Sequence, residues 1–277
     1  MKRFLSLTLS LVLLLGLCCG FAFAADSTKV YVTIADKNGL ALVQEATSVT
    51  DIDSDGKITI NDALYCAHES FFAGGAAEGY LSEMGDYGLS LKKLWGVDNG
   101  TGYGYYVNNA SAWSLADEVK EGDHITAFIY TDTTNWSDSY SYFDKNTAKV
   151  KVDEEIELTL SSVGFDADYN AVVSPVAGAT IIIGGAKSDI KTDENGKFKV
   201  SFHDAASYTL SASSDSLTLV PPSCIITVEK AAEQPPVDQP GEDTPQTGDT
   251  ASLLILAIVA VVALGGVIVI VKHRHSA

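Results

Sequence analysis

A run of twelve residues, 51–62, constrains this chain more than any other stretch of its sequence. The run reads DIDSDGKITIND, with aspartates at its positions 1, 3, 5 and 12 and a glycine at position 6. Ca²⁺ takes about six to eight oxygen ligands, and alternate side chains of a tight loop can converge on one such ion. Gly56 permits the sharp turn that brings the second half of the loop back. The run therefore predicts a calcium-binding loop.

Six positions of this loop are the expected ligands, and five of them would use side-chain oxygens. Lys57 would give only its backbone carbonyl, which leaves its charge free to point outward. The six are Asp51, Asp53, Asp55, Lys57, Thr59 and Asp62. Aspartate at the last position resembles the dockerin form of the EF-hand more than the calmodulin form, which has glutamate there. The alternative is an Asp-rich surface turn, because an Asp-Gly step suits any hairpin.

Both ends of the chain carry an apolar segment. Residues 1–24 combine a basic start, an apolar run and an Ala-Phe-Ala ending, which predicts a secretory signal peptide cleaved after Ala24. Lipidation at Cys18 or Cys19 is the lesser alternative, since neither cysteine follows a small residue. Residues 252–271 are long and apolar enough to predict a transmembrane helix. The basic residues of 272–277 predict a cytoplasmic tail.

A short motif precedes the predicted transmembrane helix. It consists of Thr244, Pro245, Gln246, Thr247 and Gly248. With the apolar run and basic tail, it resembles the sortase sorting signal of Gram-positive surface proteins, although threonine stands where that family has leucine. The resemblance implies either cell-wall attachment after cleavage between Thr247 and Gly248, or a retained membrane anchor. Both outcomes leave the body of the protein on the outer face of the cell.

The charge of that body excludes one class of partner. The chain has 18 basic and 36 acidic residues and a net charge of −18. Four of the basic residues lie in the two terminal segments, so the body carries 14 basic and 36 acidic residues and a net charge of −22. Nucleic acid is an improbable partner, because its phosphates attract basic surfaces. We interpret Cys66 and Cys224 as separate thiols rather than as a disulfide.

Residues 26–146 are expected to form one α+β domain. Residues 29–34 and 40–49 show strand patterns on either side of an Asn-Gly turn. The calcium loop follows, and apolar residues then recur at helical spacing from Asn61 to Phe72, before Gly74-Gly75. The order strand, strand, loop, helix is the opening of a β-grasp-like fold, in which the metal loop would join the second strand to the helix.

A later part of this domain resembles a known family. Residues 104–108 read GYYVN, and residues 119–130 read VKEGDHITAFIY. These runs are similar to the C-terminal β-domain of transcobalamin and intrinsic factor, and closer still to a bacterial surface domain of unknown function that resembles it. The resemblance covers about residues 28–145 and implies a corrinoid or similar small molecule as ligand.

A ligand face would use the aromatic side chains of this region. Indole and phenol rings stack on flat ligands and sugars, and asparagine donates hydrogen bonds to them. The candidate residues are Trp95, Tyr103, Tyr105, Asn108 and Trp113. The alternative is that about half of them face a sheet core, because strand alternation sends Tyr105 and Tyr106 to opposite faces.

Residues 148–229 are expected to form an all-β sandwich. Short strand patterns recur with turn signals between them, at 150–152, 156–160, 179–183, 197–202, 208–212 and 225–228. The runs 175–181, 192–198 and 207–210 resemble the Ig-like, transthyretin-type modules of bacterial surface proteins, which implies a stalk. Residues 193–196 read DENG and predict a hairpin turn rather than a second calcium loop. Residues 231–250 predict an acidic, proline-rich, extended linker.

Two functions fit this organisation, and neither is enzymatic. The first is a calcium-binding cell-surface protein whose outermost domain binds a small molecule, with a corrinoid as the leading candidate. The second is an adhesive or structural surface protein that binds a protein or a glycan and uses calcium as a structural ion. No nucleophile–base, phosphate-loop or zinc motif occurs in the sequence.

Overall fold

A computed structural model describes residues 27–230 except residues 87 and 101. The described part is mostly β-strand, with two short helices. No helix within it is long and apolar enough to cross a membrane. The predicted signal peptide, linker, sorting signal, transmembrane helix and cytoplasmic tail all lie outside the described residues.

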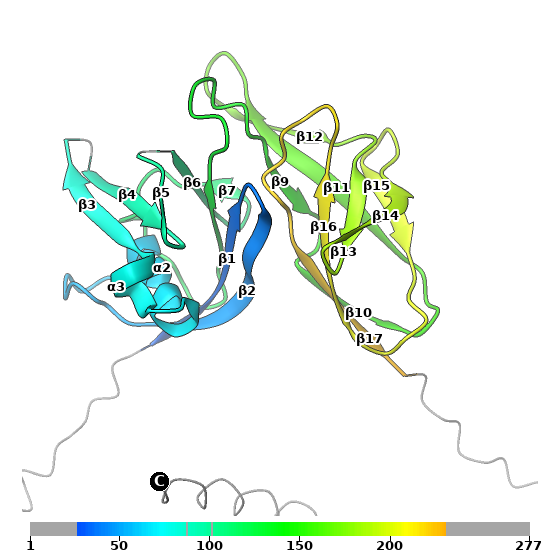
Figure 1. Cartoon of the computed structure of the whole chain (residues 1–277), viewed down its shortest axis with the longest axis horizontal. Helices are drawn as coiled ribbons and strands as arrows, with labels where there is room; N and C mark the ends of the chain where they lie inside the picture. Colours follow the sequence, from blue (N-terminus) through cyan, green and yellow to red (C-terminus); the bar gives the residue numbers. More distant parts are fainter. Residues whose placement is uncertain (1–26, 87, 101, 231–277) are drawn as a thin grey trace, which may run out of the picture. The chain divides into compact units, whose positions relative to one another are not determined.

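The first sheet has five strands in the order β2-β1-β8-β6-β7, and β1 and β8 run parallel (Figure 1). Its strands are β1 (Thr28–Asp36), β2 (Gly39–Val49), β6 (Tyr103–Val107), β7 (Ala110–Ser111) and β8 (His124–Ile129). The predicted hairpin is confirmed: β1 and β2 are antiparallel, and Gly39 supplies the positive φ of 126° that the turn requires. Alternating β-branched residues bury one side of β1 in the main core.

Helix α2 (Ile60–Phe71) packs on β1 and β2 and contributes Ile60, Leu64 and Ala67 to that core (Figure 1). The predicted helix is therefore present, but it ends at Phe71, before Gly74-Gly75. Gly74, with a left-handed φ of 93°, is instead the N-cap of a separate short helix, α3 (Gly75–Gly79), and Gly75 is the first residue of that helix. A small sheet follows, formed by β3 (Leu81–Gly85), β4 (Gly88–Leu94) and β5 (Val97–Asp98).

The remaining strands form two sheets that enclose a second core. One sheet has the order β10-β17-β16-β13-β14, and the other has β12-β11-β15, with β9 also paired to β11. The strands are β9 (Tyr140–Phe143), β10 (Thr147–Lys151), β11 (Ile156–Phe165), β12 (Ala171–Pro175), β13 (Thr180–Ile183), β14 (Ala186–Lys191), β15 (Lys197–Val200), β16 (Ser207–Ser213) and β17 (Cys224–Glu229). Leu158, Leu160, Ile181, Leu210 and Ile226 are fully buried between the sheets.

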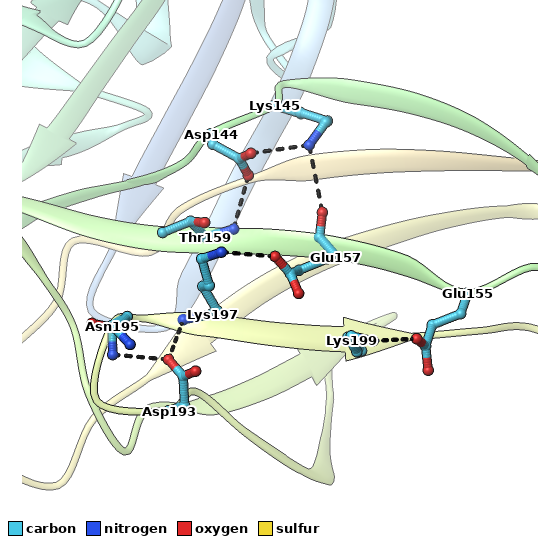
Figure 2. Close-up of polar contacts among 9 residues, drawn as sticks. All are labelled: Asp144, Lys145, Glu155, Glu157, Thr159, Asp193, Asn195, Lys197 and Lys199. Carbon is cyan, nitrogen blue, oxygen red and sulfur yellow. Dashed lines mark hydrogen bonds and ion pairs between the residues drawn. The ribbon is translucent and has the colours of Figure 1, made fainter.

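Residues 193–196 form the predicted turn and not a calcium loop, but the turn does not close a hairpin, because β14 and β15 on either side of it belong to different sheets. Asp193 accepts hydrogen bonds from the backbone N–H groups of Asn195 and Lys197, each at 2.8 Å, so its carboxylate closes the turn (Figure 2). On the neighbouring strands, Lys197 pairs with Glu157 at 2.9 Å and Lys199 with Glu155 at 2.7 Å. Such exposed ion pairs contribute little to stability.

A third apolar cluster joins the two cores. Tyr106 of β6 stacks on Tyr140 of β9 at a centroid distance of 3.6 Å, and Phe128 and Val163 are buried beside them. Strand β9 lies before residue 146, where the sequence placed the end of the first domain, yet it pairs with β11 of the second body. The two bodies of residues 27–230 therefore share a buried aromatic contact.

Candidate calcium loop and aromatic residues

The twelve-residue loop joins the end of β2 to the start of α2. Its last residues form the cap of the helix: Thr59 is the N-cap, and its hydroxyl accepts a hydrogen bond from the Asp62 backbone at 3.3 Å. The Asp62 carboxylate in turn accepts one from the Thr59 backbone at 2.8 Å. This reciprocal pair is a capping box, which satisfies backbone N–H groups that the helix itself leaves unpaired.

Three aspartates converge in the first half of the loop. Carboxylate oxygens of Asp51, Asp53 and Asp55 all lie within 4.8 Å of one another. Asp51 is held in place by the backbone N–H groups of Ser54 and Gly56, at 2.6 and 2.8 Å. The hydrogen bond from Gly56 in particular lowers the pKa of Asp51. The loop therefore folds so that its alternate acidic side chains face one point.

The one basic side chain of the loop forms its ion pair outside the carboxylate cluster. Lys57 is the only basic residue of residues 51–62, and its ammonium pairs with Glu118 at 2.9 Å. The pKa of Asp53 is raised, chiefly by partial desolvation and also by repulsion from Asp55 and Asp62. The hydrogen bond from the Asp55 backbone acts in the opposite direction and lowers it in part. A divalent cation among the three carboxylates would relieve that repulsion.

Asp62 lies behind the cluster rather than in it. Its side chain is buried, and its second oxygen accepts a hydrogen bond from the Ile52 backbone at 3.1 Å. The Thr59 hydroxyl donates to Asp62 at 2.7 Å. Of the six expected ligands, the structure brings together the side chains of three, and it uses Thr59 and Asp62 to fix the loop to the helix.

A distant segment, residues 115–119, holds the second half of the loop. The Val119 backbone donates to the Ile58 carbonyl at 2.9 Å, and the Ile60 backbone donates to the Asp117 carbonyl at 3.0 Å. Thr59 and Glu118 form an isolated antiparallel bridge. Sequence reasoning missed this segment, because nothing in residues 115–119 marks them as partners of a loop nearly sixty positions earlier.

The donors present in the loop fit calcium. The three converging groups are all carboxylates, and hard oxygen donors suit Ca²⁺ and Mg²⁺ rather than the transition metals that prefer nitrogen or sulfur. Calcium also tolerates the irregular geometry of a partly exposed loop better than Mg²⁺ does. Asp51, Asp53 and Asp55 would hold the ion, and its chemistry there would be to neutralise and order the loop.

Most of the candidate ligand-face residues have partners within the fold. The Tyr103 hydroxyl donates to the Lys92 and Val97 carbonyls and accepts from the Asn99 backbone at 2.6 Å. Trp95 and Tyr105 are half-buried against the main core. Asn108 has a left-handed φ of 49° and bridges to Asp123 and His124, which makes it part of a turn.

Trp113 differs from these four residues. Its side chain is 93% exposed, although large aromatic side chains are usually well buried. The carboxylate of Asp117 accepts hydrogen bonds from the Trp113 and Ser114 backbones at 2.8 and 3.2 Å, so the backbone under the indole is fixed. Asp117 belongs to the segment that holds the calcium loop, which links the exposed indole to that loop.

His68 has a structural role beside this site. It is fully buried on α2. Its Nε2 accepts from the Trp95 backbone at 2.9 Å, so the proton lies on Nδ1, which donates to the Leu64 carbonyl at 2.6 Å. Protonation of Nε2 would break the contact with Trp95. Burial lowers the pKa of His68 to about 4.

We expect this histidine to make the fold acid-sensitive. Its pKa is lower in the folded chain than in the unfolded chain, where the ordinary value is 6.5. Its contribution to stability is therefore complete above pH 6.5 and is lost as the pH falls toward 4, by at most about 1.4 kcal/mol per pH unit. Urea unfolding of the wild type and of His68→Gln between pH 4 and 7 measures this. If the free energy of unfolding depends on pH equally in the two proteins, the assignment is contradicted.

The comparisons with known proteins leave the family open. No protein-family model matches the chain, and no curated protein matches it. Among solved structures, the four N-terminal Ig domains of Dscam1 isoforms 7.44 and 4.44 each align at 11% identity, over 76% of this chain and 45% of theirs, with a TM-score of 0.23. The chain thus spans less than half the length of these structures, and a similarity this weak carries no argument about fold or function.

Proposed function

We propose that this chain is a non-enzymatic cell-surface protein whose outermost module is held in shape by a structural calcium ion. The convergence of Asp51, Asp53 and Asp55 within 4.8 Å carries the proposal, because Lys57, the one basic side chain of the loop, forms its ion pair with Glu118 rather than with these carboxylates. Extracellular calcium is near millimolar in many habitats, so even a weak loop of this kind would be loaded. The ion would be constitutive rather than a signal.

The cellular location in this proposal rests on the two ends of the sequence. A signal peptide at residues 1–24 would export the chain. The motif at residues 244–248, with the apolar run 252–271, would attach it to the wall or the membrane. In this arrangement the β-grasp-like module carrying the calcium loop is outermost, and the Ig-like sandwich of residues 148–229 acts as its stalk.

Of the two roles expected from the sequence, we favour adhesion to a protein or glycan over capture of a corrinoid. Tyr103, Trp95, Tyr105 and Asn108 have partners within the module. Trp113 is the one candidate whose ring is almost fully exposed. An exposed indole on a backbone fixed by Asp117 suits a flat partner, since aromatic anchors contribute strongly at binding surfaces.

Trp113→Ala separates the two roles. We expect the wild type to bind no cobalamin in equilibrium dialysis, with or without EGTA, and to bind a glycan or extracellular-matrix array. The substitution should remove most of the array signal, because loss of an aromatic anchor weakens the binding free energy by about 1–3 kcal/mol. It should leave the melting temperature unchanged. Tyr169→Ala is the matched control, because Tyr169 is also exposed (84%) but lies in the second body. Micromolar cobalamin binding would favour the corrinoid role instead.

A further inference from the structure

A groove lies between the β1–β2 hairpin and the outer face of the sheet that contains β13 and β16. Its volume is about 680 Å³, within the range of about 300–1,000 Å³ that is typical of small-molecule sites. One wall is formed by residues 37–40 and Val43, and the other by β13, β16 and residues 213–221. Ile182 and Ser211 face each other across the two strands on this wall, while Ile181 and Leu210 point into the core.

Contacts beside the groove hold its walls in fixed positions. Gln44 of β2 has a left-handed φ of 48°, and its backbone donates to the Thr33 hydroxyl at 3.0 Å. Its side-chain amide reaches the second body and donates to the Asn146 carbonyl and the Ser223 hydroxyl, both at 3.0 Å. With the buried stacking of Tyr106 on Tyr140, these bonds indicate a groove that is formed before any ligand arrives.

The groove has a charge opposite to that of the chain as a whole. The chain has a net charge of −18, yet none of the described residues that line the groove is acidic, and Lys37 is the one charged residue among them. Asp36 precedes it, but its carboxylate accepts two hydrogen bonds from Asn38, at 2.7 and 3.2 Å. An anionic group would therefore meet less repulsion here than elsewhere on the surface.

The rest of the lining is mostly apolar, with a few hydroxyl groups. Leu40, Val43, Ile182, Leu217 and Leu219 supply apolar surface. Ser211 lines the floor and is 8% exposed, and its buried hydroxyl has no hydrogen-bond partner among the described residues. Buried hydroxyl groups are nearly always paired, so the Ser211 hydroxyl has unused hydrogen-bonding capacity beside the groove, which a rotation of its side chain would offer to a ligand oxygen.

We propose that this groove binds an amphipathic organic anion, an apolar body with a single carboxylate, of the size of a medium-chain fatty acid. Lys37 supplies the positive charge that attracts the carboxylate. The leucine, valine and isoleucine walls cover the apolar body, and Ser211 hydrogen-bonds to an oxygen of the ligand. The site is separate from the calcium loop and from Trp113, so it goes beyond the proposed function.

Photolabelling of the full-length chain tests the proposal. The probe is decanoic acid with a terminal diazirine, applied to the protein in lipid nanodiscs, and mass spectrometry identifies the labelled peptides. We expect label in the peptides that contain residues 37–43 and 209–221. Excess decanoate should compete for it, and uncharged decanol should compete at least about tenfold less well. Label spread evenly over the described residues, or equal competition by decanol, would overturn the proposal.

Three variants sharpen the test. Lys37→Glu should lower the labelling about tenfold, whereas Lys191→Glu, the same charge reversal at an exposed lysine outside the groove, should leave it unchanged. Ser211→Ala should lower labelling about three- to tenfold, without lowering the melting temperature, because it removes a hydroxyl that has no partner. Equal effects of the two lysine variants, or full labelling of Ser211→Ala, would contradict the assignment.

Discussion

Replacing Asp51 and Asp55 together by alanine abolishes the calcium dependence of the melting temperature. In the wild type, calcium at a hundredfold excess over its Kd stabilises the folded chain by about 2.7 kcal/mol, which raises the melting temperature by about 5–10 °C for a chain of this size. The double variant loses two of the three converging carboxylates. Differential scanning calorimetry in calcium and in EGTA measures the effect.

The control for this experiment is an aspartate outside the loop. Asp215→Ala removes an exposed carboxylate in another surface loop and should keep the full calcium shift. The double variant should melt near the temperature of the EGTA-treated wild type, since both lack the ion. A calcium shift in the double variant that equals that of the wild type would exclude this loop as the site.

Phe128→Ala destabilises the chain by about 3–5 kcal/mol, the usual cost of removing a buried phenylalanine. Phe128 is 1% exposed in the cluster shared by the two bodies, and its ring lies against Tyr130 at a centroid distance of 4.9 Å. The ring fills the space left by Gly104, where a Cβ would overlap it. The substitution therefore leaves a cavity at the junction, and urea unfolding measures its cost.

Phe165→Ala is the matched control, because Phe165 is 53% exposed. We expect this control to change stability by no more than about 0.5 kcal/mol, as is usual for surface positions. If the two bodies unfold together, Phe128→Ala shifts one transition. If it instead shifts only one of two separate transitions, the shared cluster does not couple the bodies.

The local elements of this fold could be predicted from the sequence because they rest on local patterns. Alternating β-branched residues gave the hairpin of β1 and β2, and helical spacing after Asn61 gave α2. Alternation also placed Tyr105 and Tyr106 on opposite faces, and they indeed pack in different clusters. Turn chemistry identified the turn at Asp193, but the strands on either side of it pair in different sheets rather than with each other.

What the sequence missed depends on contacts between distant residues. The segment at 115–119 that holds the calcium loop, and the pairing of β9 with β11, follow from tertiary packing, which no local pattern records. Strands β12 and β14 were also missed, because both are edge strands without a buried face. Composition alone did not separate the exposed Trp113 from Trp95, which packs beside His68.

Isothermal titration of calcium into the metal-free chain tests the central claim most directly. We expect one ion bound per chain in the range of calcium affinities known for extracellular modules, with a Kd of about 10⁻⁴–10⁻³ M, and no detectable heat with the Asp51→Ala, Asp55→Ala double variant. Magnesium at the same concentration should bind more weakly, since it requires stricter geometry. A wild-type chain that takes up no calcium would contradict the account.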